Sequence, residues 1–288
     1  MLALLLLVAV SPADRAKDVA ARLTIARDAM REIHRSAAAI SDPALRSAVE
    51  AIVMAPWLPS EAYAVAHPAE TERTLRAAGF LEGKLEVPAQ RGSFQTACSG
   101  ADHPYPGGLA VHSWAGLLNA RGIAESDQRV HGVKLRDEWL VAAAVWRDAL
   151  EAATLPWRSD ATCGPEQRIA GAPAHHIYGI ATAMLRHLPE GLLLTIASAQ
   201  PGALDGGTKT VCDWLRAASV VADGKEPAAP CPANVPVEGY AMSIAGADRV
   251  LTSTAWSWYA AHTPGGWERF EALIQDGSDV AAWARARR

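Results

Sequence analysis

Apolar residues recur at helical spacing along nearly the whole chain, and no run of alternating β-branched residues interrupts them. This pattern predicts an all-α fold. Residues 14–40 form one long amphipathic pattern, which predicts a single helix. Asp42 and Pro43 follow it and predict the start of the next helix, because aspartate caps helices and proline suits their first turn. A further helix is expected over residues 70–78, where Gly79 ends it.

The composition and the apolar periodicity change twice in the middle of the chain. Residues 83–106 are rich in Gly, Pro, Ser and Gln and lack periodicity, which predicts a long loop; such loops in compact domains are often functional. Four or five apolar helices are expected between residues 107 and 223. A Pro-rich stretch at 226–236 then reads as a linker before a tail with four tryptophans: Trp256, Trp258, Trp267 and Trp283. We interpret Trp256 and Trp258 as core or interface residues.

Polar residues with metal-binding chemistry stand at the ends of these apolar segments. The segment 105–112 reads YPGGLAVH and opens a helix with His112. The apolar run 139–146 ends in Arg147-Asp148, 36 residues after His112. His175 and His176 open a further helix, and Asp223 follows the apolar run 215–221. Imidazole and carboxylate groups together suit divalent transition metals.

This succession resembles the core of the HD-domain metal-dependent phosphohydrolases over about residues 102–223. The resemblance implies an HD-domain-like helical bundle with helical N- and C-terminal extensions. It further implies a metal site of Fe, Mn, Zn or Ni, with these ligands: His112, Asp148, His175 and Asp223. Asp148 and His176 would act in catalysis, and Arg147 and His176 would bind substrate. Because His175 and His176 point about 100° apart on a helix, only one of them can face a given cation.

Arg147 departs from this family, which has a histidine at that position. A guanidinium offers only hydrogen-bond donors and cannot ligate a cation. The remaining residues could hold a metal weakly, or Arg147 could fill the site by binding Asp148 or Asp223 with its planar fork. In a third interpretation, Arg147 and Glu151 form an i,i+4 pair on the surface. Glu151 also departs from the family, many members of which have lysine there.

Two functions follow from these interpretations. The first is a metal-dependent phosphohydrolase that acts on a small phosphorylated molecule, a phosphate ester, with a degenerate site. The second is a non-catalytic HD-like protein in which Arg147 replaces the metal and which serves ligand binding or protein interaction. The expected organisation begins with a signal peptide (1–13) and an N-terminal helical region (14–94). The HD-like core (95–225) follows, and a linker with a C-terminal helical region (226–288) ends the chain.

Charge and the N-terminus restrict the partners and the compartment. A net charge of -4 without basic runs excludes an electrostatic footprint for nucleic acid. The apolar run 2–10 is too short to span a bilayer, and the small residues after it predict signal-peptide cleavage behind Ala13, hence an exported, periplasmic protein. If the run is instead a buried N-terminal helix, the protein is cytoplasmic. The four cysteines allow two disulfides in three pairings or four buried thiols.

Overall fold

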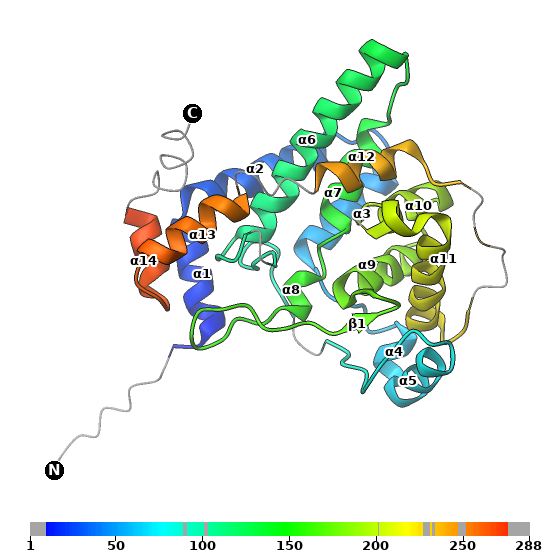
Figure 1. Cartoon of the computed structure of the whole chain (residues 1–288), viewed down its shortest axis with the longest axis horizontal. Helices are drawn as coiled ribbons and strands as arrows, with labels where there is room; N and C mark the ends of the chain where they lie inside the picture. Colours follow the sequence, from blue (N-terminus) through cyan, green and yellow to red (C-terminus); the bar gives the residue numbers. More distant parts are fainter. Residues whose placement is uncertain are drawn as a thin grey trace.

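The computed structural model describes residues 10–88, 91–100, 103–200, 202–226, 231, 234–246 and 252–275. These residues are predominantly helical, which confirms the all-α class (Figure 1). A short antiparallel hairpin of β1 (Arg168–Ile169) and β2 (Ala172–Pro173) is the only paired sheet among them. The helices are α1 (Pro12–Arg22), α2 (Thr24–Ala38), α3 (Pro43–Met54), α4 (Tyr63–Ala66), α5 (Pro68–Ala77), α6 (Gly108–His131), α7 (Asp137–Trp146), α8 (Glu151–Thr154), α9 (Ala174–Leu185), α10 (Glu190–Ser198), α11 (Gly202–Asp223), α12 (Val237–Ala245), α13 (Thr252–His262) and α14 (Glu268–Gln275).

The N-terminal region corrects one prediction and confirms others. The single helix expected over residues 14–40 is wrong, because Leu23 adopts an extended conformation and separates α1 from α2. Leu23 is nonetheless buried, so the apolar pattern continues through the break. Asp42 caps α3 as predicted, where its carboxylate accepts the backbone N–H groups of Ala44 and Leu45. The helix expected at 70–78 is α5, and Gly79 follows it with a φ of 74°.

Helix α7 passes through the centre of the molecule. All of its residues from Leu140 to Trp146 are buried, and α7 contacts α2, α3, α6, α9, α10 and α12. The indole Nε1 of Trp146 donates a hydrogen bond to the carbonyl of Gly179 at 3.0 Å, which fixes α7 against α9. Because α7 is apolar on every side, its C-terminal end delivers Arg147 and Asp148 into the interior.

The C-terminal helices pack on helices from earlier in the chain. α12 lies against α6, α7 and α10, and α14 contacts α1 (Figure 1). Trp256 and Trp267 are buried and Trp258 is half-buried, which agrees with their interpretation as core residues. Trp283 and most of the predicted linker lie outside the described residues.

The four cysteines form two disulfides in the structure, which is one of the three pairings that the sequence allowed. Cys98 is bonded to Cys163, 65 residues away, and Cys212 is bonded to Cys231, 19 residues away. None of the described helices is both long and apolar enough to cross a membrane. Residues 1–9 of the predicted signal peptide lie outside the described part, and α1 begins at Pro12 beside the predicted cleavage point.

Candidate functional site

The Pro-Gly-Gly segment positions His112 by close backbone packing. Gly107 has a φ of 86°, and a Cβ atom there would lie 2.4 Å from the Cβ of Ala26 in α2. A Cβ atom at Gly108 would lie 1.9 Å from the carbonyl oxygen of His103. Two glycines therefore allow the loop to enter α6 tightly against α2, and His112 follows one turn later, buried.

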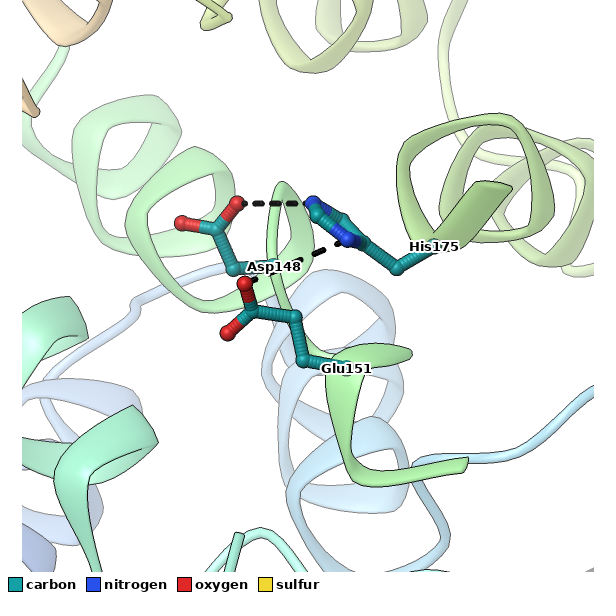
Figure 2. Close-up of side chains that lie close together, drawn as sticks. All are labelled: Asp148, Glu151 and His175. Carbon is teal, nitrogen blue, oxygen red and sulfur yellow. Dashed lines mark ion pairs between the residues drawn. The ribbon is translucent and has the colours of Figure 1, made fainter. Parts of the chain in front are cut away.

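The predicted residues converge with others at the end of α7. Asp148 lies in the turn between α7 and α8, Glu151 begins α8, and His175 lies at the start of α9 (Figure 2). Their side chains point toward one another. Together with their hydrogen-bonding neighbours they form what we call the Asp148 cluster: His112, Arg147, Asp148, Glu151, Glu166, His175 and Gln200.

One oxygen of Asp148 faces Arg147 and His112. Arg147 Nε donates to Asp148 Oδ2 at 2.6 Å, and Arg147 Nη2 lies 2.6 Å from His112 Nε2. Because the guanidinium can only donate, His112 Nε2 accepts this bond and its lone pair is occupied. His112 Nε2 is also 3.2 Å from Asp148 Oδ2. The guanidinium thus bridges two of the predicted metal ligands, His112 and Asp148.

Arg147 also joins the cluster to α12. Its Nη1 donates to the carbonyl of Met242 in the last turn of α12 at 3.3 Å, where the helix dipole favours a cation. Gly246 leaves room for this contact, since a Cβ atom there would lie 1.6 Å from Nη1. Arg147 and Glu151 are each 5 % exposed, so the interpretation as a surface pair is wrong. The apolar run before Arg147 carries both residues into the core.

The other oxygen of Asp148 faces His175 and Gln200. His175 Nε2 lies 3.3 Å from Asp148 Oδ1, and Gln200 Nε2 donates to the same oxygen at 3.0 Å. Burial alone would raise the pKa of Asp148, but the charge of Arg147 and the hydrogen bond from His175 hold it well below its usual range. Asp148 is therefore an ionised carboxylate with contacts on both oxygens.

Glu166 orients the ring of His175. Its carboxylate accepts the backbone N–H of His175 and lies 2.8 Å from the ring Nδ1. Burial alone would lower the pKa of His175, but Glu166, Asp148 and Glu151 raise it well above its ordinary value. The imidazolium can then donate to Glu166 from Nδ1 and to Asp148 from Nε2.

Glu151 is the least satisfied member of the cluster. Its Oε1 lies 3.9 Å from His175 Nδ1, and its buried Oε2 has no hydrogen-bond partner. Burial raises the pKa of Glu151 to about 8, and the nearby carboxylates of Asp148 and Glu166 add to this. Asp148, Glu151 and His175 lie close enough together to hold a metal ion. The free carboxylate oxygen of Glu151 fits such an ion.

His176 faces away from the cluster, as the 100° rotation between neighbouring residues requires. Its Nε2 lies 3.1 Å from the carbonyl of Ala197, and its ring stands edge-on to Trp214. Burial lowers the pKa of His176 to about 3, which keeps the imidazole neutral. The structure therefore does not bring His176 to Asp148, where the resemblance would give it catalytic and substrate-binding roles.

Asp223 also lies away from the cluster. It is exposed at the C-terminal end of α11, and Gly224 behind it packs against the ring of Tyr63. Trp214, which contacts His176, precedes Asp223 by nine residues, or roughly 13 Å of helix. Of the four predicted metal ligands, the structure brings together His112, Asp148 and His175.

Sequence reasoning missed Glu166 and Gln200 as members of the cluster. Glu166 lies in the aperiodic segment before β1, and Gln200 follows the end of α10. Neither position belongs to a recognisable local pattern. Glu151 had a usable signal, because a carboxylate three residues after Asp148 lies one helical turn further along the chain.

No family model, curated protein or solved structure matches this chain. The resemblance to HD-domain proteins therefore rests on the segments that contain His112, Asp148 and His175.

Proposed function

We propose that this chain is a non-catalytic HD-like binding protein in which Arg147 replaces the metal. The observation that carries the proposal is the position of the guanidinium, 2.6 Å from both Asp148 Oδ2 and His112 Nε2. A cation between these atoms would have to displace Arg147, whose side chain is buried and holds a third bond to α12. Loss of that pairing would be costly in a region of low dielectric.

The charges of the cluster support the same proposal. The Arg147 guanidinium pairs with Asp148, and His175 pairs with Glu166 at 2.8 Å. Two buried carboxylates thus already face two cationic partners, and an added dication would meet the fixed charge of Arg147. Both disulfides are compatible with an oxidising compartment and support the predicted export to the periplasm.

A second candidate is a metal-dependent phosphohydrolase that uses the opposite face of Asp148. Its supporting observation is the set of Asp148, Glu151 and His175, in which Glu166 holds the ring Nδ1 and leaves Nε2 toward Asp148 Oδ1. Carboxylates that orient a metal-binding histidine in this way are common. A bound Fe, Mn, Zn or Ni would supply an activated water and polarise a phosphate ester. Arg147 is the nearest fixed cation for the phosphate group.

Metal analysis of three proteins separates the candidates. Wild type, Arg147→His and Arg147→Gln are purified without a histidine tag, incubated with Zn²⁺ or Mn²⁺, desalted and measured by elemental analysis. The proposal predicts negligible metal in wild type and a clear gain in Arg147→His. Arg147→Gln is the matched control, because it removes the cation without adding a ligand, and it should gain less.

Other metal contents would contradict the proposal. One equivalent of metal in wild type, lost in His175→Gln, would contradict the proposal and support the phosphohydrolase. A folded Arg147→His protein with no additional metal would mean that His112 and Asp148 do not converge on a cation. Near-ultraviolet circular dichroism confirms that each variant is folded.

A further inference from the structure

A second candidate site lies on the C-terminal side of the molecule, outside the Asp148 cluster. A cavity of about 390 Å³ opens beside Gly100 and Pro104, between the loop at 155–164 and the helices α13 and α14. The lining residues that matter for the argument are Gly100, Leu155, Cys163, Trp256, Arg269 and Phe270. The volume lies within the range of small-molecule sites, roughly 300–1,000 Å³.

Arg269 is the cation of this cavity, and the described part of the chain offers it no counterion. Among the described residues, no carboxylate lies within ion-pair distance of it, and its buried Nε has no hydrogen-bond partner. Its guanidinium makes one long hydrogen bond, from Nη2 to the carbonyl of Ala260 at 3.4 Å. An arginine has five donors, and leaving them unsatisfied in a partly buried position is unfavourable. Because Arg269 lines the cavity, an anion bound there could supply the missing partner.

Aromatic side chains line the same cavity as Arg269. Trp256 and Phe270 lie almost parallel, with ring centres 6.1 Å apart and an interplanar angle of 24°. Tyr105 packs on Trp256, and Trp157 stands edge-on to Phe270, so the lining rings are held by neighbouring rings. A rigid aromatic wall of this kind favours flat or branched apolar groups.

We propose that this cavity binds a small organic carboxylate with an aromatic or branched aliphatic body. The carboxylate would accept two parallel hydrogen bonds from the Arg269 fork, and the body would pack on Trp256 and Phe270. One arginine matches one negative charge, which favours a carboxylate over a phosphate dianion. This inference rests on the proposed function, because it takes the chain to be a binding protein. It adds the chemical class of the ligand.

The disulfide between Cys98 and Cys163 fixes the geometry of the cavity. Cys163 belongs to the lining, and the bond ties the 155–164 loop to the loop that contains Gly100. An antiparallel bridge between Trp157 and Cys163 closes the same loop. The preformed walls lower the ordering cost of binding, so the oxidised protein is the binding form.

The test is isothermal titration calorimetry of the full, oxidised chain with phenylacetate and with its neutral analogue phenylacetamide. Wild type should bind phenylacetate at least about tenfold more tightly than the amide, because a hydrogen bond to a charged group is the stronger one. Arg269→Gln should lose this preference, and Arg269→Lys should retain part of it. Arg158→Gln is the matched control, since Arg158 is an exposed arginine of the adjacent loop and should leave affinity unchanged.

Four results would overturn the inference. Equal affinities for phenylacetate and phenylacetamide, or an unchanged acid affinity in Arg269→Gln, would show that Arg269 does not receive an anion. Tighter binding of phenyl phosphate than of phenylacetate would contradict the carboxylate assignment. No binding of phenylacetate, isovalerate or benzoate would reject the site. Metal content reports separately on the proposed function, and a folded Arg147→His protein should keep its phenylacetate affinity.

Discussion

Arg147 and Arg269 are the same side chain in two opposite settings. Arg147 is 5 % exposed and bonds to Asp148, to His112 and to the carbonyl of Met242. Arg269 is half-buried beside aromatic rings and has one long hydrogen bond to Ala260. The first guanidinium is saturated by the protein itself, whereas the second still has donors to offer.

The contrast shows that a cation's partners indicate its role better than its burial does. A buried arginine with satisfied donors links helices, and here Arg147 links α7, α6 and α12. An arginine whose donors face a cavity is available to a ligand. The Asp148 cluster therefore has fewer free hydrogen-bond donors for a ligand than the Arg269 cavity. We expect the tryptophan-rich C-terminal region to bind the ligand.

Replacing each arginine by alanine should change the free energy of unfolding by very different amounts, and this is the largest difference that we predict. Arg147→Ala leaves the buried Asp148 without its cation and should lower the free energy of unfolding by on the order of 4 kcal/mol. Arg269→Ala removes one long hydrogen bond and should cost under about 1 kcal/mol. Urea unfolding followed by circular dichroism measures both. Equal losses would contradict the assignment of a structural role to Arg147 alone.

The disulfides offer the next largest effect. The double variant Cys98→Ala/Cys163→Ala opens the longer loop and should lose about 3 kcal/mol of stability, about 1 kcal/mol more than Cys212→Ala/Cys231→Ala. Only the first pair borders the Arg269 cavity, so only its removal should weaken phenylacetate binding. Thermal melts with and without reductant provide the check on wild type. Identical melting temperatures would show that neither disulfide stabilises the fold.

Local patterns predicted the helical class and several helix ends, but not the break at Leu23 or the β1–β2 hairpin. Apolar periodicity gave the helical class, Asp42 and Gly79 marked helix ends, and the composition of residues 83–106 indicated a loop. The expected convergence of Asp148 and His112 came from the resemblance to HD-domain proteins and not from the apolar run before Arg147. Helical spacing correctly required His175 and His176 to face different neighbours.

The missing parts of the site depend on how the helices are directed in space. Periodicity defines the buried face of α11 but not the direction of its axis, so Asp223 could be matched to the site although α11 carries it away. Glu166 and Gln200 reach Asp148 and His175 through tertiary packing of a loop and a helix end. The bond from Arg147 to Met242 arises because α12 folds back on the core.

The smallest predicted effect is a pH dependence that isolates Glu151 in the metal-free protein. Burial raises the pKa of Glu151 to about 8 from 4.5, so the folded protein keeps a proton that the unfolded chain releases. The resulting stability is fully present below pH 4.5 and is lost progressively as the pH rises toward 8. Glu151→Gln mimics the protonated carboxyl and should abolish this loss.

Comparison of the two proteins separates Glu151 from Asp148, whose lowered pKa makes stability fall in acid. The raised pKa of His175 makes stability fall as the pH rises, and because the charge of Glu151 is one of its causes, Glu151→Gln reduces this loss in the same direction. Between about pH 5 and 8, wild type should therefore lose on the order of 2 kcal/mol more than Glu151→Gln in urea unfolding. Parallel curves would mean that Glu151 is already ionised in the folded state. The cluster would then carry an unmatched carboxylate beside His175, and the contrast with the Arg269 cavity would weaken in favour of a metal site.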